Sequence, residues 1–166
     1  MTRVPSSWRL ADVSIDPTFC LFHSGSRPLA MPVEHVAEIT EVGPLVRISR
    51  CPQQVAGLCV YHQHVLPVLS LGGGLRIPDE VALVAQTEAG LWALGVDRGG
   101  TQIVTARPAR HDPARDESGV VTVGLVRREG VDHGLIDAEA TWRSFRAMIE
   151  GTFLAPASTL PNSARS

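Results

Sequence analysis

The stretch Val55–Leu71, VAGLCVYHQHVLPVLSL, decides the fold, because it has the pattern of two β-strands joined by a short polar turn. In the second strand, successive side chains point to opposite faces of the sheet. The two faces carry Val65, Pro67 and Leu69 on one side, and Leu66, Val68 and Ser70 on the other. Both faces are apolar, so one is expected in a core and the other is available for a partner protein.

Short segments of this kind recur along the whole chain. They are rich in Val and Ile and are bounded by Gly, Pro, Ser or Asp, which is typical of strands. The ten segments are Phe19–His23, Leu29–Val33, Leu45–Ile48, Val55–Tyr61, Val65–Leu71, Val81–Ala85, Leu91–Val96, Thr101–Thr105, Val120–Arg127 and Gly134–Asp137. About ten short strands predict a mostly β fold, a sandwich or barrels. Helical segments do not separate them, which argues against a parallel sheet.

One segment has clear helical periodicity, from Ala138 to about Glu150. Asp137 suits the N-cap position, and Gly151 follows where a C-terminal cap is expected. The apolar stripe of this helix consists of Trp142, Phe145, Met148 and Ile149. We expect this helix to pack across one end of the β structure. A shorter piece, Val33–Ile39, is predicted to be a turn or the edge of a strand.

Other parts of the chain lack periodicity. Arg107–Gly119 is polar and contains proline, which predicts an exposed loop. Gly72–Gly74 lacks the Lys and Ser/Thr of a phosphate-binding loop, so a flexible turn is expected. The predicted organisation is an N-terminal extension over residues 1–16, one β domain over 17–150 and a flexible tail over 151–166.

The composition excludes several classes of protein. Of the 166 residues, 44% are hydrophobic and 19% charged, as in globular proteins. A net charge of −2 gives no support for a nucleic-acid partner. The start of the chain lacks the apolar core of a signal peptide, and no apolar run approaches the roughly 20 residues that cross a bilayer. We therefore expect a cytoplasmic protein without membrane insertion, and Cys20 and Cys59 buried as free thiols.

Candidate catalytic and metal-binding residues are few. His62 and His64 share one face of a strand and are candidate metal ligands, but no further Cys/His pair has ligand spacing. Two surface histidines are the alternative. Cys59 has apolar neighbours, so a Cys59–His62 dyad lacks support. Asp97 and Asp137 each follow a strand and fit acids that cap turns better than a catalytic carboxylate pair. We predict no catalytic residue, no bound metal and no cofactor.

Five motifs occur in a fixed order. They are FCLF (Phe19–Phe22), LAMPVEHVAEI (Leu29–Ile39), CPQQVAGLCVYHQHVLPVLSL (Cys51–Leu71), LWALGVDRGGTQIV (Leu91–Val104) and VGLVRREGVDHGLIDAEATW (Val123–Trp142). Together they resemble the CheW-like domain of bacterial chemotaxis coupling proteins over about residues 17–150.

The resemblance implies two intertwined SH3-like five-stranded β-barrels with a C-terminal helix. It also implies a scaffold without enzymatic activity or cofactor, which links chemoreceptors to the histidine kinase CheA. The implied partners are the CheW-like regulatory domain of CheA, the cytoplasmic tip of methyl-accepting chemoreceptors, and other CheW-like domains or a second copy. The implied location is the cytoplasm, at membrane receptor arrays.

The same resemblance implies a partner-binding surface. The family's "VxxVxEI", "vxGv" and "vvPvidL" elements, and the turn between the last two, match ten candidate residues: Val33, Val36, Glu38, Ile39, Val55, Gly57, Leu58, His62, His64 and Pro67. For the apolar members, a place in the core is the alternative interpretation.

The chain departs from the family at the turn. The family's "NLRG" is Val60-Tyr61-His62-Gln63 here, so His62 replaces the arginine that lies near Glu38. We predict a Glu38–His62 contact that is weaker and depends on pH. Gln63 replaces a glycine, so the turn itself is expected to differ. Two alternatives stay open: a divergent paralogue that self-assembles or binds another partner, and a small metal-dependent enzyme using His62 and His64.

Overall fold

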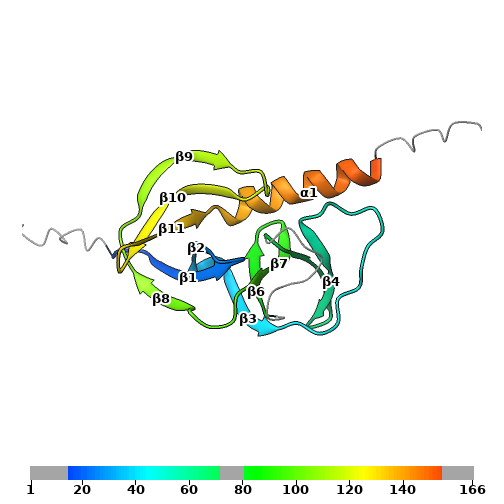
Figure 1. The fold of residues 1–166 in the computed structure, drawn as a ribbon, viewed down its shortest axis with the longest axis horizontal. Helices are drawn as coiled ribbons and strands as arrows, with labels where there is room; N and C mark the ends of the chain where they lie inside the picture. Colours follow the sequence, from blue (N-terminus) through cyan, green and yellow to red (C-terminus); the bar gives the residue numbers. More distant parts are fainter. Residues whose placement is uncertain (1–14, 72–80, 155–166) are drawn as a thin grey trace, which may run out of the picture.

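The computed structural model describes residues 15–71 and 81–154. Within them the chain forms eleven strands, a short 3-10 helix and one α-helix (Figure 1). The elements are β1 Thr18–Ser24, β2 Arg27–Pro32, η1 Val33–His35, β3 Val36–Glu41, β4 Val55–Tyr61, β5 His64–Leu69, β6 Val81–Thr87, β7 Gly90–Val96, β8 Gln102–Thr105, β9 Ala109–Arg115, β10 Val121–Arg128, β11 Val131–Ile136 and α1 Ala138–Leu154. Most of the predicted N-terminal extension, the Gly72–Gly74 turn and residues 155–166 lie outside the described residues.

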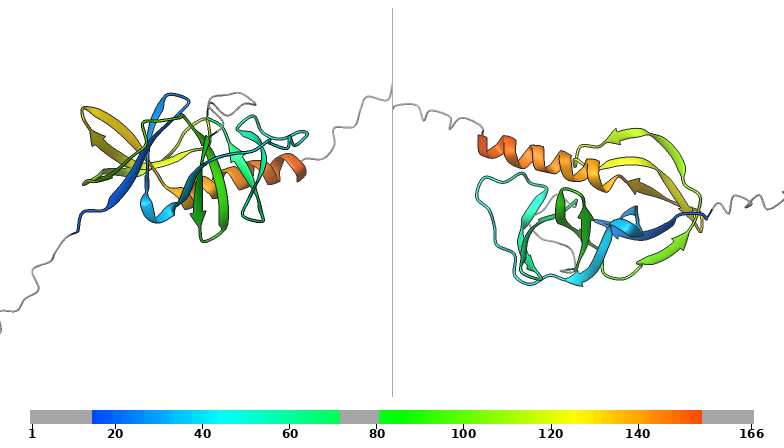
Figure 2. Two further views of the ribbon diagram at one scale, coloured as in Figure 1. Left: turned by 90° about the horizontal axis from the view of Figure 1, so that it is seen from below. Right: turned by 180° about the vertical axis from the view of Figure 1, so that it is seen from behind.

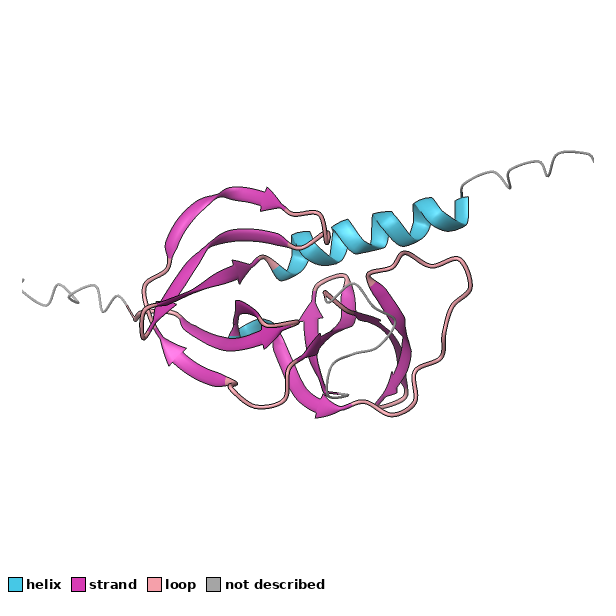
Figure 3. Cartoon of the chain, viewed as in Figure 1, coloured by secondary structure: helices cyan, strands magenta, loops and turns pink. Residues whose placement is uncertain are grey.

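The strands form two curved sheets that lie side by side (Figures 2 and 3). One sheet has the order β8-β1-β2-β11-β10-β9, and the other has the order β3-β6-β7-β5-β4. All neighbouring strands are antiparallel except the pairs β2–β11 and β5–β7. The second sheet uses only the chain between β2 and β8, so one β subdomain is inserted into the other. This confirms the expected mostly β fold of two subdomains with a C-terminal helix.

The first sheet has six strands rather than the expected five, because the predicted loop Arg107–Gly119 contains β9. Every side chain of β9 is exposed, so the strand has no hydrophobic periodicity that a sequence could reveal. Its pairing with β10 depends on the backbone, and Gly124 permits the close approach: a Cβ there would lie 2.6 Å from the Ala109 carbonyl oxygen. Pro113 lies where the register of the two strands shifts, a place that tolerates a missing N–H donor. Leu45–Ile48, by contrast, is not a strand but contributes one isolated bridge, Val46 to Leu58.

The core has three parts. One lies inside the six-stranded sheet and includes Phe19, Leu21 and Val126, and a second lies inside the five-stranded sheet around Leu66 and Val68. The largest lies between the two sheets and the helix, where Phe145 is fully buried and Trp92 of β7 stacks on Trp142 at 6.4 Å between ring centroids. Cys20 and Cys59 are buried free thiols, as the sequence predicted, and burial raises the pKa of both.

The helix begins as predicted and ends later. The Asp137 carboxylate accepts a hydrogen bond from the Ala140 N–H at 2.9 Å, which makes Asp137 the N-cap. The predicted stop at Gly151 is wrong, because the helix continues to Leu154. Gly151 has no positive φ, and Thr152 donates to the Met148 carbonyl at 2.9 Å in the next turn. Glycine therefore weakens this helix locally without ending it.

Asp97 joins the two sheets. It follows β7 of the second sheet, and its carboxylate accepts the N–H groups of Gly25 and Ser26 in the β1–β2 turn of the first, at 3.1 and 2.9 Å. Its own N–H donates to the His23 carbonyl at 2.8 Å. Ser26 has a φ of 64°, a conformation that costs free energy in a residue with a side chain. Asp97 is thus an acid that caps a turn and does not pair with Asp137.

Asp116 stabilises the turn between β9 and β10. Its Oδ1 accepts the N–H groups of Ser118 and Val120 at 2.9 and 3.1 Å, and its Oδ2 forms an ion pair with Arg27 of β2. Burial by itself would raise the pKa of Asp116, but the hydrogen bonds from Ser118 and Arg27 and the positive charge of Arg27 hold the pKa below its usual value.

Asp116→Asn is expected to lower the free energy of unfolding by about 1 kcal/mol at neutral pH. Because the pKa is lowered in the folded state, the carboxylate stabilises the fold above about pH 4 and this contribution is lost as pH falls through the folded pKa. The difference between wild type and variant should therefore shrink in acid, as measured by urea unfolding. Asp112→Asn on exposed β9 is the control. An equal difference at all pH values would contradict this role.

Candidate functional site

The β4–β5 hairpin turns through His62 and Gln63. Their φ values are 41° and 70°, so both central residues of the two-residue turn are left-handed, as in a type I′ turn. Glycine and asparagine are the usual residues there. The turn therefore keeps a left-handed backbone although the glycine of the family pattern is absent. Both side chains are exposed at the tip of the hairpin.

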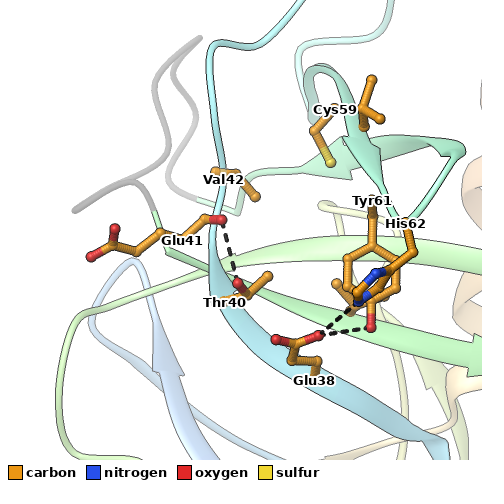
Figure 4. Close-up of a pocket in the computed structure, with 9 residues that line it drawn as sticks. Glu38, Thr40, Glu41, Val42, Cys59, Tyr61 and His62 are labelled. Carbon is orange, nitrogen blue, oxygen red and sulfur yellow. Dashed lines mark hydrogen bonds and ion pairs between the residues drawn. The ribbon is translucent and has the colours of Figure 1, made fainter.

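Glu38 of the edge strand β3 faces this turn (Figure 4). Its Oε2 accepts a hydrogen bond from the Tyr61 hydroxyl at 2.9 Å and lies 3.6 Å from Nε2 of His62. The hydrogen bond to Glu38, then partial burial and the carboxylate charge, raise the pKa of Tyr61. The predicted Glu38–His62 contact is therefore present, and Tyr61 is a third member that the sequence did not indicate.

A shallow pocket of about 200 Å³ lies between β3 and β4, the two edge strands of the five-stranded sheet. Glu38, Tyr61 and His62 border it at one end (Figure 4). Cys59 and Val84 contribute apolar walls. The remaining lining residues are Thr40, Glu41, Val42 and Val60. The pocket is open to solvent and sits where the edges of this sheet do not pair with each other.

The outer face of the hairpin carries an exposed apolar surface. Val60 and Val65 are opposite each other across β4 and β5 and are 77% and 63% exposed. The half-buried pair Leu58 and Pro67 follows on the same face, and Val46 is bridged to Leu58 and is 65% exposed. We call these residues the hairpin patch: Val46, Leu58, Val60, Val65 and Pro67. Exposed apolar groups that gather on one face are typical of protein-binding surfaces.

Gly57 allows Val46 to join the hairpin patch. A Cβ on Gly57 would lie 2.7 Å from the Val46 carbonyl oxygen, which is closer than packed atoms come. The backbones of Val46 and Leu58 exchange two hydrogen bonds of 2.9 Å at this point. A side chain at position 57 would push the segment around Val46 away from β4.

The ten predicted partner-binding residues fall into two groups. The exposed or half-buried group near the turn or in the hairpin patch is Glu38, Leu58, His62, His64 and Pro67. The other group lies inside the fold: Val33, Val36 and Ile39 are half-buried against the inter-sheet core, and Val55 and Gly57 are buried. Of this second group, only Gly57 is seen to shape the hairpin patch, through its close approach to Val46.

Sequence reasoning missed Val46 and Val60 as surface residues. Val60 could have been placed from the turn, since a two-residue hairpin puts it opposite Val65. The position of Val46 could not be predicted in this way, because a long connection brings this residue to β4. Only the close approach of the Val46 backbone to Gly57 shows where it lies.

A metal-binding cluster does not appear in the part of the chain that the structure describes. No group of three or more His, Cys, Asp or Glu is placed to hold a metal ion among residues 15–71 and 81–154. The burial that raises the pKa of the Cys59 thiol opposes formation of a reactive thiolate.

The family follows from comparison of the whole sequence. The family model described as CheW-like domain matches residues 18–129, which are 112 of the 166 residues. This chain belongs to the CheW-like domain family. The match includes the five-stranded sheet, the hairpin patch and every strand of the six-stranded sheet except β11, and it ends before β11 and α1 begin.

A solved structure shares the fold of this CheW-like chain. The crystal structure of the scaffolding protein TtCheW from Thermoanaerobacter tengcongensis is similar with a TM-score of 0.62 and 14% sequence identity, covering 76% of this chain and 88% of that chain. No curated protein matches the sequence significantly. None of the helices formed by the described residues has the length and apolarity needed to cross a membrane.

Proposed function

We propose that this CheW-like chain is a non-catalytic adaptor whose hairpin patch docks onto the CheW-like regulatory domain of a histidine kinase CheA. Membership of the family supports a scaffolding role in chemotaxis-type signalling. The exposed hairpin patch is the observation that carries the proposal. Val60 and Val65 are opposite each other and more than 60% exposed, so neither side chain is buried in the core of its sheet. The second partner in this proposal is the cytoplasmic tip of a chemoreceptor, which would place the protein at receptor arrays in the cytoplasm.

The chemistry of the hairpin patch fits docking of a second β-domain. Val60, Val65 and Val46 form an apolar centre, and the exposed polar turn residues His62 and Gln63 lie at the hairpin end of it. An apolar centre with a polar rim is the usual anatomy of a protein interface. β-Branched side chains also lose little conformational freedom when they are covered.

Calorimetric titration of the full chain with the CheA regulatory domain of the same organism tests the proposal. We expect saturable one-to-one binding with a dissociation constant in the micromolar range, as for a modest interface. Absence of binding at millimolar concentration, with both proteins folded, would overturn it. A chain that instead forms concentration-dependent oligomers in sedimentation, and ignores the kinase domain, would be the self-assembling paralogue.

His62→Arg is expected to remove a pH dependence from this binding. Histidine side chains in general change charge between about pH 5 and pH 8. The contact of His62 with Glu38 is an ion pair only when the imidazole is protonated. We expect the wild type to bind the kinase domain about two- to fivefold more tightly at the acid end of this range, the size expected of an exposed ion pair.

Arginine keeps its charge throughout, so the variant should bind at both pH values as the wild type does in acid. His111→Arg, on an exposed histidine of β9 in the other sheet, is the matched control and should retain the wild-type pH dependence. An unchanged affinity and an unchanged pH profile in His62→Arg would exclude this role for the Glu38–His62 contact.

A further inference from the structure

Two imidazole rings meet at one end of the otherwise apolar interior of the six-stranded sheet. His133 of β11 is 6% exposed, and His23 of β1 is half-buried. Their ring centroids are 5.8 Å apart and the planes cross at 74°, an edge-to-face contact. Strand β2 lies between β1 and β11, so the rings meet across the width of one strand, over Pro28.

Among the described residues, His133 forms no ion pair that would balance a positive charge by direct contact. Within the described residues, no hydrogen-bond partner reaches its Nδ1. Val126 is opposite it on β10, and Arg128 follows on the same face of that strand with a charge of the wrong sign. Asp132 precedes it on β11 and its carboxylate attracts a charge on His133 across the strand, but its side chain points to the other face, where Arg127 binds it at 2.6 Å.

The half-buried His23 also forms no ion pair among the described residues. Pro28 is opposite it on β2, and Gly100 is the residue beside its Nδ1. The carboxylate of Asp97 is already bonded to the N–H groups of Gly25 and Ser26. A proton on either ring would therefore place an unpaired charge in a largely apolar site, next to the second imidazole.

We propose that His23 and His133 form a pH-sensitive contact that keeps the junction of the two sheets closed while both rings are neutral. The His23 carbonyl accepts the Asp97 N–H at 2.8 Å, and the neighbouring Ser24 hydroxyl donates to the Gly95 carbonyl of β7. Displacement of a protonated ring moves this end of β1 and weakens the bonds that hold the β1–β2 turn to Asp97. The device is separate from the Glu38–His62 contact, which mild acid strengthens.

Amide hydrogen exchange at Gly25 and Ser26 in the full chain tests this proposal, with rates expressed as protection factors so that the intrinsic effect of pH is removed. We expect protection at both amides to fall about tenfold between about pH 7.5 and about pH 5.5 in the wild type. His133→Phe keeps an aromatic ring in the same space and should retain full protection at both pH values. His64→Gln, which changes an exposed histidine, should behave as the wild type.

An equal loss of protection in His133→Phe and wild type would overturn the proposal, and so would a wild type whose protection does not change. If His133→Phe does not fold, His23→Phe provides the same test, because it removes the other ring from a half-buried position.

Discussion

Replacing Asp97 with alanine is expected to lower the free energy of unfolding by about 2–3 kcal/mol. The substitution removes a carboxylate that accepts two backbone N–H groups, and hydrogen bonds to a charged acceptor contribute about 1.5–3 kcal/mol. The left-handed conformation of Ser26 costs free energy, and without this carboxylate it loses the hydrogen bond that offsets the cost. Urea unfolding followed by tryptophan fluorescence measures the change, since Trp92 and Trp142 report on the inter-sheet core.

Two controls separate this effect from a general effect of losing an acid. Asp97→Asn keeps one acceptor oxygen, so it should lose only part of the stability. Asp112→Ala on exposed β9 should lie within about 0.5 kcal/mol of the wild type. If Asp97→Ala is as stable as Asp112→Ala, the junction between the sheets depends on other contacts.

The double substitution Val60→Glu and Val65→Arg is expected to weaken binding of the CheA regulatory domain by about 100-fold. Residues at the centre of an interface often cost 2 kcal/mol or more when they are changed, and each 1.4 kcal/mol is a factor of ten. The two new side chains lie opposite each other and carry opposite charges, so they can pair across the strands and keep the hairpin folded. Calorimetry gives the affinity, and thermal unfolding confirms the fold.

Ile103→Arg is the matched control, because Ile103 is an exposed apolar residue on β8 of the other sheet and is 63% exposed, the same as Val65. It should bind as the wild type does. This pair of positions is a cleaner test than Val36 or Gly57, whose side-chain changes would also disturb the core or displace Val46. Wild-type affinity in the Val60→Glu/Val65→Arg protein would exclude the hairpin patch as the docking surface.

The features that the sequence could predict are those with a side-chain pattern. The alternation from Val65 to Ser70 predicted one apolar face in a core, and the structure shows that this is the face of Leu66 and Val68. The stripe from Trp142 to Ile149 identified the packed face of the helix. The resemblance to the family placed Glu38 beside His62 although 23 residues of intervening chain gave no local sign of it.

The features that were not predicted depend on backbone hydrogen bonds and on contacts between residues that are far apart in the sequence. Strand β9 is held by pairing with β10 while all its side chains face solvent. The helix passes through Gly151 because glycine permits a cap without imposing one. Val46 reaches the hairpin patch only because Gly57 has no Cβ. In each case the deciding contact joins residues whose side chains carry no periodic signal.

Backbone amide chemical-shift mapping during titration with the CheA regulatory domain tests the docking surface most directly, since this 17.8 kDa chain suits solution NMR. We predict that the largest shifts lie on β4 and β5, around Val60 and Val65, with smaller ones at Glu38 of β3. Strands β8 and β9 of the other sheet should change little. Shifts concentrated on β8 and β9, with an unchanged β4–β5 hairpin, would contradict the proposed docking surface.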